Sequence, residues 1–226
     1  MSQAHRESLL LALQEEVQTK LRIFAGDIST KATTAAIQEA LQQMQPTIHF
    51  LINNAGFGKM GSVDDIALED LQHMIRVNDL APVTLTMMCL PYMPRGSRIG
   101  QICSVAGFMP IPYLNVYAAT KAFLYHYSRA LAVELKPKGI SVTAVCPYWV
   151  QDTEFIDVAK RHANGSYFPH ILFGCHERDV VASAWKSICR GDSVSTPGWV
   201  ATLLHLTSHI LPFRLIMALT QLVRRM

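Results

Sequence analysis

Short apolar segments alternate along this chain with longer segments in which apolar residues recur every three or four positions. The short segments predict buried strands at 21–25, 49–52, 98–104 and 140–146. The longer segments predict helices at 6–18, 31–44 and 116–135 and within 65–90. Such alternation is typical of a parallel sheet with helices on both faces, so the sequence predicts an α/β fold with a doubly wound, Rossmann-type parallel sheet.

Polar residues or turn residues stand where the predicted strands end. Asp27, Asn53, Ser104 and Pro147 each lie at such an end. Ligands of open parallel sheets bind outside the carboxyl ends of the strands. We therefore expect the functional site to include these positions.

The composition limits the classes of protein that need to be considered. The chain has 226 residues, of which 50% are hydrophobic, and no internal repeat or low-complexity linker, so one domain over 1–226 is expected. The net charge of +3 is small and its basic residues are scattered, which argues against a nucleic-acid partner. No apolar run reaches the roughly 18 residues that a membrane span needs.

The cysteines and the N-terminus favour a cytoplasmic location. The five cysteines lie far apart, with no C-x-x-C pair and no visible disulfide framework, as expected in a reducing compartment. The first twenty residues are amphipathic and include acidic side chains, unlike a signal peptide.

The strongest chemical signal is Tyr117-Ala-Ala-Thr-Lys121. Positions i and i+4 share one face of a helix, so the phenol and the ammonium can point into one pocket. A nearby cation favours the phenolate, and we expect Lys121 to lower the pKa of Tyr117. Ser104, at a strand end, can hydrogen-bond a substrate oxygen. Taken singly, such a pair is usually a solvated helix face, and a lone serine usually caps a turn.

Taken in order, these residues resemble the short-chain dehydrogenase/reductase family. Asn53-Asn54-Ala55-Gly56 is similar to the family's NNAG motif, and Asn78 to its helix asparagine. Ser104 and the Tyr117/Lys121 pair resemble the rest of its catalytic tetrad. The resemblance covers residues 21–155.

The resemblance implies an oxidoreductase that moves hydride between a nicotinamide cofactor and a carbonyl or alcohol. Tyr117 is then the acid or base, Lys121 assists it and holds the nicotinamide ribose, and Ser104 orients the carbonyl. Asn78 is then the residue that holds a relay water. Asp27 resembles the aspartate that contacts adenine. The remaining cofactor-binding positions implied are Asn53, Ala55, Gly56, Pro147, Val150 and Thr153. No metal is expected, since the reaction needs none.

The chain departs from the family at its start. The Gly-rich turn T-G-x-x-x-G-x-G, which binds the pyrophosphate, is absent, because Gly26 is the first glycine. We expect the sequence to begin after the family's second strand, so that segments 21–25 and 49–52 pair directly or residues 1–45 dock poorly. Cofactor binding should be weakened. The alternative function is an impaired remnant that acts as a binding or regulatory protein.

Two further segments bear on cofactor and pocket. Ala4-His5-Arg6-Glu7 resembles the family's stretch that grips a 2′-phosphate, which favours NADP and leaves NAD possible. An exposed helix start explains it equally well. Tyr148 and Trp149 either narrow the pocket or pack in the core.

The C-terminal third is predicted to close the pocket. Residues 155–180 correspond to the variable substrate lid, whose apolar side chains favour a lipophilic small-molecule substrate. Residues 198–226 form an apolar extension that could lie on a membrane surface or pack against another subunit. Packing is favoured, since family members usually form homo-oligomers. His205 and His209 have a metal-compatible spacing but no third ligand.

Overall fold

The structure is a computed structural model that describes residues 11–13, 15–16, 19–160, 174–208 and 210–218. The chain divides into two compact units, Met1–Pro46 and Thr47–Met226. The single domain expected over 1–226 stays a prediction.

The first unit is built around the helix α2 (Lys31–Met44). Thr30 caps its start by accepting a hydrogen bond from the Thr33 amide, and Gln45 ends it in the left-handed region, immediately before Pro46. Both bounds match the predicted helix 31–44. Residues 11–13 and 15–16 are also helical, whereas the rest of the predicted helix 6–18 lies outside the described residues.

The strand predicted at 21–25 is wrong. These residues have no regular secondary structure and are only partly buried. Arg22 lies over the Phe24 ring at 5.4 Å and donates to Met44 Sδ at 2.8 Å, so the segment is held by side-chain contacts. A short apolar run forms a strand only when neighbouring strands satisfy its backbone groups. Asp27 therefore does not stand at a strand end, contrary to the prediction.

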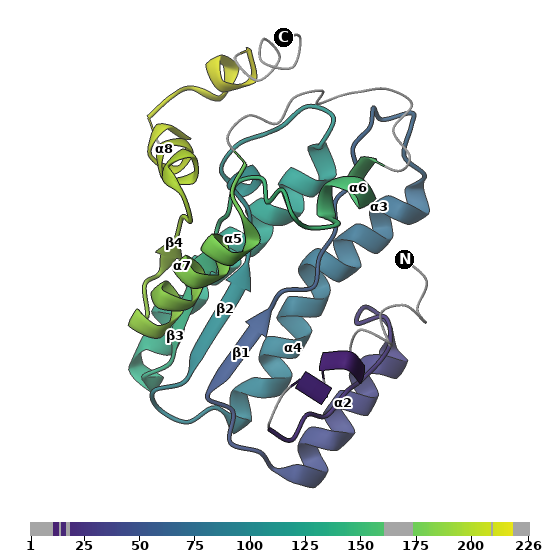
Figure 1. Ribbon diagram of the computed structural model, residues 1–226, viewed down its shortest axis with the longest axis vertical. Helices are drawn as coiled ribbons and strands as arrows, with labels where there is room; N and C mark the ends of the chain where they lie inside the picture. The colour runs from purple at the N-terminus through teal and green to yellow at the C-terminus, as the bar shows by residue number, and fades with distance from the viewer. Residues whose placement is uncertain (1–10, 14, 17–18, 161–173, 209, 219–226) are drawn as a thin grey trace. The chain divides into compact units, whose positions relative to one another are not determined.

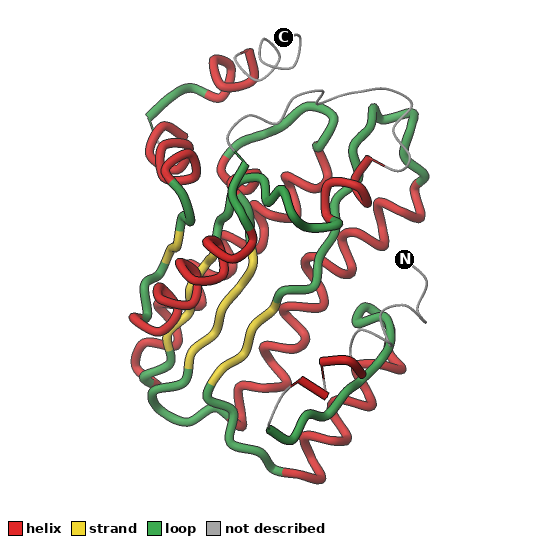
Figure 2. The backbone as a smooth tube through the Cα atoms, viewed as in Figure 1, coloured by secondary structure: helices red, strands yellow, loops and turns green. Residues whose placement is uncertain are grey.

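The second unit contains a four-stranded sheet in the order β1-β2-β3-β4. All pairs are parallel, with Phe50 opposite Arg98, Arg98 opposite Ser141 and Ala144 opposite Val194. The strands are β1 (Phe50–Asn53), β2 (Arg98–Ile102), β3 (Ser141–Val145) and β4 (Val194–Ser195). Within this sheet β1 pairs only with β2, so the doubly wound sheet is open at β1 (Figure 2).

Helices cover both faces of this sheet, as Figure 1 shows. Helices α4 and α5 contact β1, β2 and β3 on one face, and α7 contacts β2, β3 and β4 on the other. The α-helices of this unit are α3 (Leu68–Ile75), α4 (Ala81–Cys89), α5 (Asn115–Leu135), α6 (Phe155–Lys160), α7 (Glu177–Arg190) and α8 (Trp199–Ser208). The α/β prediction is thus confirmed.

Four short turns of other helix types connect these elements. They are the π-helix η1 (Arg76–Leu80) and the 3-10 helices η2 (Leu90–Tyr92), η3 (Val105–Phe108) and η4 (Lys136–Lys138). The π-helix joins α3 to α4 without a break, as such bulges often do at functional sites. Helix α5 leads into Pro137 and Gly139, the latter at φ 70°.

The strands predicted at 49–52, 98–104 and 140–146 and the helix at 116–135 are confirmed, each to within two residues. The two-residue β4 was not predicted because two residues carry too little pattern. Helix α7 was not predicted either, although Val180, Ala184 and Ile188 recur in it at helical spacing. Among the described residues, no helix is both long enough and apolar enough to cross a membrane.

Candidate active site

The candidate site is a cavity of about 600 Å³ at the carboxyl ends of the strands in the second unit. Its polar end is lined by Asn54, Gly56, Ser104, Tyr117 and Lys121. Apolar side chains form most of the remaining wall: Met109, Ile111, Tyr148, Trp149, Phe155, Val180, Leu204, Leu211 and Ile216. One end can therefore carry polar chemistry, and the rest can hold an apolar group.

Tyr117 and Lys121 extend from the same face of α5, as their spacing predicts. Both are buried, with exposed fractions of 7% and 4%. Lys121 Nζ lies 5.7 Å from the centre of the Tyr117 ring and donates to the Ile102 carbonyl at 2.8 Å. The ammonium is thus held between the end of β2 and the tyrosine.

The pKa values of these two groups are set mainly by burial. Burial raises the pKa of Tyr117 above its usual value, and a hydrogen bond with Ser104 opposes that rise. The expected lowering of the Tyr117 pKa by Lys121 is not what the structure gives. Burial also lowers the pKa of Lys121. At neutral pH the phenol therefore keeps its proton, which is the form that a general acid needs.

Ser104 follows β2 and caps the turn η3. Its Oγ accepts a hydrogen bond from the Ala106 amide at 3.1 Å. The Ser104 side chain also forms a hydrogen bond with the Tyr117 side chain. The capping role and the chemical role that the sequence left as alternatives are therefore compatible. The cap fixes the hydroxyl beside the phenol.

Asn78 lies in the π-helix η1 and is fully buried. Its Nδ2 donates to the Phe57 carbonyl at 2.9 Å and to Thr120 Oγ1 at 3.0 Å, and its Oδ1 accepts from the Phe57 amide at 3.1 Å. Asn78 thus connects the loop after β1 to the residue before Lys121. It does not line the cavity, so its contribution here is to position that loop and α5.

Gly56 brings the loop after β1 close to the side chains of Asn78 and Lys121. A Cβ at this position would lie 3.2 Å from Asn78 Oδ1 and 3.3 Å from Lys121 Nζ. Glycine therefore leaves room beside the ammonium, at the wall of the cavity.

The structure brings together only part of the predicted cofactor set. Gly56, Tyr117, Lys121, Pro147, Val150 and Thr153 line the cavity, whereas Asn53 and Ala55 do not. Asn53 is buried and donates to Thr86 Oγ1 at 3.0 Å, so it ties β1 to α4. Asp27, in the first unit, accepts from the Ser29 amide and hydroxyl at 2.8 and 2.7 Å, a local turn.

Sequence reasoning missed two features of the site and its surroundings. The first is Asp79, which does not line the cavity but follows Asn78: burial raises the pKa of its carboxyl to about 7, and the charge of Lys121 opposes the rise. The second is the wall formed by Leu204, Leu211 and Ile216, more than eighty residues after Lys121. No local motif signals these wall residues, because only the folded chain brings them to the cavity.

Tyr148 and Trp149 both narrow the cavity and pack in the core. They line the cavity and also lie against buried clusters around Phe108 and Tyr117. In the predicted lid 155–180, Phe155 contacts the Tyr117 ring at 5.4 Å. Residues 161–173 of that lid lie outside the described residues.

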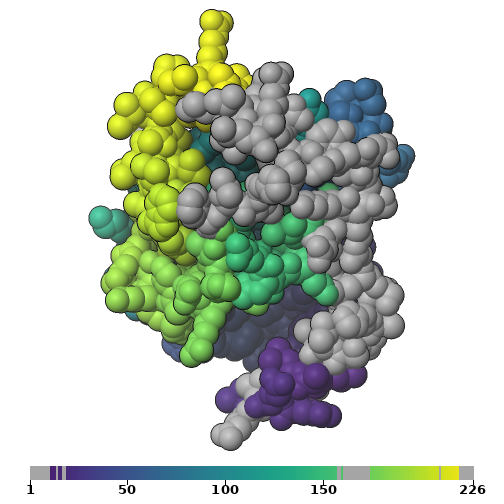
Figure 3. All heavy atoms as spheres, turned by 45° about the horizontal axis from the view of Figure 1, so that its top comes forward, coloured from purple at the N-terminus to yellow at the C-terminus, as the bar shows by residue number. Residues whose placement is uncertain are grey.

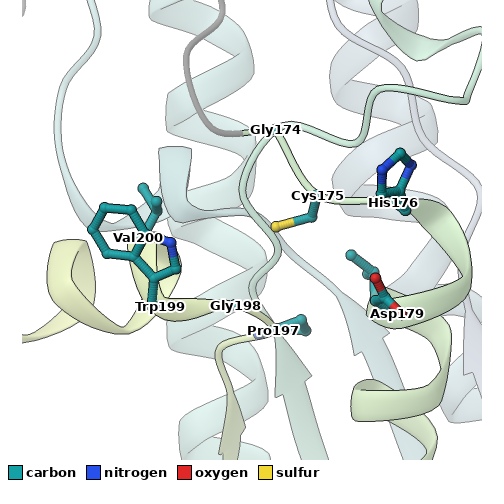
Figure 4. A pocket seen from close by; sticks show the side chains of 9 residues that line it. Gly174, Cys175, His176, Asp179, Pro197, Gly198, Trp199 and Val200 are labelled. Atoms are coloured by element: carbon teal, nitrogen blue, oxygen red, sulfur yellow. The ribbon is translucent and has the colours of Figure 1, made fainter.

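A second, smaller cavity of about 350 Å³ lies beside the start of α7 (Figure 4). The Cys175 sulfur points toward Gly198 and Trp199, while His176 and Asp179 lie on the other side. His176 pairs with Asp152 at 3.5 Å, away from the thiol. His205 forms a hydrogen bond with Tyr125 Oη at 3.2 Å, and His209 lies outside the described residues.

The second unit thus combines a parallel α/β sheet with a serine, a tyrosine and a lysine in the cavity at the carboxyl ends of its strands. The model of the short chain dehydrogenase family matches residues 1–163. The chain belongs to the short-chain dehydrogenase/reductase family.

Two curated relatives show how far the likeness extends. A very-long-chain 3-oxoacyl-CoA reductase of Yarrowia lipolytica is 27% identical over 226 residues, covering 88% of this chain and 55% of the relative. Ketoacyl reductase HetN of Nostoc sp. is 35% identical over 129 residues, covering 56% of this chain and 45% of the relative. This chain thus spans about half the length of the curated relatives it matches.

A solved structure gives the same fold. The short-chain dehydrogenase from Sphingobium yanoikuyae, in complex with NADPH, has a TM-score of 0.74 and 26% sequence identity. The match covers 92% of this chain and 80% of that one.

Proposed function

We propose that this chain catalyses the NADPH-dependent reduction of a lipophilic ketone to an alcohol. The observation that carries the proposal is the cavity in which Ser104, Tyr117 and Lys121 meet and whose remaining wall is mostly apolar. NADP is preferred to NAD, which stays possible. The relatives are ketoacyl reductases, and a solved relative contains NADPH.

Tyr117 and Ser104 act on the carbonyl oxygen. The bound nicotinamide supplies the hydride. Because burial raises its pKa, Tyr117 keeps a proton at neutral pH and donates it to the oxygen as negative charge develops there. The Ser104 hydroxyl donates a hydrogen bond to the same oxygen and orients it. This protonation state favours reduction over oxidation.

Lys121 and Asn78 assist Tyr117 without contacting the substrate oxygen. The ammonium, held by the Ile102 carbonyl, supplies positive charge 5.7 Å from the centre of the Tyr117 ring once the proton has left, although burial sets the resting pKa of the phenol. Asn78 fixes the loop 54–57 against α5 through Phe57 and Thr120, so Gly56 stays beside the ammonium. Here Asn78 is a positioning residue.

The residues present fit the nicotinamide end of a cofactor. Gly56, Pro147, Val150 and Thr153 line the same cavity as Tyr117 and Lys121, and Gly56 leaves space that a Cβ would fill. These residues would hold the nicotinamide and its ribose together with Lys121. The chain offers no Gly-rich turn for the pyrophosphate.

The apolar wall supports a substrate with a hydrocarbon chain. The side chains of Leu204, Leu211 and Ile216 come from the C-terminal segment, and those of Met109 and Ile111 from the turn before α5. Burying a hydrocarbon chain against them is favourable by about 25 cal/mol per Å².

The expected cytoplasmic location and homo-oligomer stay predictions.

The test is to replace Tyr117 by Phe and follow NADPH oxidation with 3-oxoacyl thioesters of increasing length. We expect Tyr117→Phe to lower turnover by about 10²- to 10⁴-fold, since general acid catalysis is lost. Tyr127→Phe is the matched control, because it removes the same atom from the same helix at a ring stacked on Phe123, outside the cavity. It should stay close to the unaltered chain.

Two results contradict the proposal. Near-normal turnover by Tyr117→Phe shows that the phenol is not the acid. If the unaltered chain, folded by circular dichroism, oxidises no NADPH with any of the thioesters, the alternative of a binding or regulatory protein takes its place.

A further inference from the structure

Helix α8 and the residues after it expose one row of large apolar side chains. Trp199, Leu203 and Leu206 lie at positions i, i+4 and i+7, which share a helix face. Their exposed fractions are 65%, 50% and 58%, and those of Ile210 and Phe213 beyond the helix are 80% and 55%. Figure 3 shows this C-terminal segment, in yellow, on the surface of the molecule.

The opposite face of α8 packs against the rest of the second unit. Ala201 is buried in the core cluster, His205 packs against Phe108 at 4.8 Å, and Leu204 lines the cavity. Both faces of α8 therefore carry large apolar side chains, and Leu203 and Leu206 stay exposed on the outer face. Exposed apolar side chains gathered on one face mark a surface that another molecule or a membrane covers.

The charged residues after Asp192 favour one kind of partner for this face. No acidic residue follows Asp192, whereas Arg214, Arg224 and Arg225 all do. Of these, Arg214 is described and exposed. A second copy pairing through this face would bring the same positive charges together, which is unfavourable. Anionic lipid headgroups would attract them.

We propose that the outer face of α8 and residues 210–215 bind the surface of an anionic phospholipid bilayer. The apolar row enters the boundary between headgroups and acyl chains, with Trp199 at its base, and Arg214 contacts the phosphates. The binding is peripheral, and it stands whether or not the chain is an enzyme. Where the proposed function also holds, Leu204 and Leu211 place the cavity close to the membrane that dissolves its substrate.

The test is sedimentation of the full chain with vesicles of phosphatidylcholine, alone or mixed with phosphatidylserine. We expect binding to the mixed vesicles, weakened by salt. Leu203→Ser/Leu206→Ser should lower the affinity at least about tenfold, since two leucines no longer leave water. Neither residue lines the catalytic cavity, so NADPH oxidation of a short, water-soluble ketone should not change.

Val63→Ser/Val133→Ser is the matched control. Both valines are more exposed than the two leucines and lie outside α8, so vesicle binding should stay as in the unaltered chain. Arg214→Gln should reduce the preference for phosphatidylserine. Circular dichroism checks that every variant is folded.

Two outcomes overturn the proposal. One is equal vesicle binding by the leucine variant and the unaltered chain. The other is no vesicle binding at all, together with a dimer that the leucine variant dissociates in light scattering, which would make this face an interface between copies. Failure of the proposed function is recognised separately, by absent turnover with intact vesicle binding.

Discussion

Asp79 follows Asn78 in η1, and the fold shifts the pKa of its carboxyl toward the neutral range. Its Oδ1 is buried and has no hydrogen-bond partner among the described residues. Burial raises its pKa from 3.8 to about 7, and the charge of Lys121 only partly opposes this. The folded chain therefore favours the protonated carboxyl of Asp79 more than the unfolded chain does, so folding and protonation are linked.

The linkage predicts that Asp79 makes the protein less stable as pH rises from about 4 to about 7. In that window the folded state binds a proton that the unfolded state has lost, so stability falls with rising pH. Asp79→Asn removes this term. We expect the free energy of unfolding of the variant, relative to the unaltered chain, to rise by about 1–2 kcal/mol between pH 4 and pH 8. This figure discounts the full shift because the group is partly exposed.

Urea unfolding at both pH values measures this difference. The exposed Asp64, changed to Asn, is the control and should give no comparable gain. Equal stability differences for Asp79→Asn at the two pH values would show that the carboxyl titrates alike in both states.

At the residue scale, spacing predicts that Tyr117 and Lys121 share a helix face but not what surrounds them. The i, i+4 rule correctly places Tyr117 and Lys121 on one face of α5, and the structure adds Ser104 beside them. The sequence could not give the burial that raises the Tyr117 pKa, nor the role of Asp79. Both depend on the loop 54–58 and on α3–η1–α4, which approach α5 only in the folded chain.

Among the elements, the packing of η3 on α5 places Ser104 beside Tyr117. Gly107 makes this approach possible, since a Cβ there would lie 2.6 Å from the Lys121 carbonyl oxygen and 2.8 Å from its carbon. These are backbone atoms of a helix and cannot move aside cheaply. The turn is therefore restricted to glycine by contact, independently of its backbone angles.

We predict that Gly107→Ala destabilises the protein by about 1–3 kcal/mol, the usual cost of overpacking. Turnover should fall as well, because η3 moves Ser104 away from Tyr117. Gly56→Ala is the contrasting variant: its Cβ meets only the ends of the Asn78 and Lys121 side chains, so it should lose activity with a smaller loss of stability. Thermal unfolding and NADPH oxidation measure the two effects. A fully stable Gly107→Ala variant would contradict the packing argument.

At the element scale, prediction succeeds where burial pattern and breakers agree. Helix α2 is matched at both ends because Thr30 and Pro46 bound it, and α5 ends near Pro137. The segment 21–25 has the apolar run of a strand but no strand beside it, and the run alone cannot show that. In β4 two residues carry too little pattern to be recognised, although their pairing with Ala144 and Val145 extends the sheet.

For the whole molecule, the cavity is assembled from segments that are far apart in the chain, from Asn54 to Ile216. Every described residue that lines it belongs to the second unit. These residues fit the nicotinamide and ribose of a cofactor, and the chain has no Gly-rich turn at a helix N-terminus for a pyrophosphate. Most of the binding energy for the cofactor should therefore come from its nicotinamide half.

This division predicts how the 226-residue chain binds nucleotides. The dissociation constant for NADPH should lie within about tenfold of that for reduced nicotinamide mononucleotide, since the sequence has no T-G-x-x-x-G-x-G turn to bind the pyrophosphate. Fluorescence titration of each nucleotide measures both constants. Adenosine 2′,5′-bisphosphate, which carries only the other half of NADPH, should not compete. Competition at micromolar concentration would show that this chain binds the adenosine half of NADPH without the Gly-rich turn. Asp27 would then be the first residue to replace. Its carboxylate accepts two hydrogen bonds from Ser29, which it would have to give up in order to contact the nucleotide.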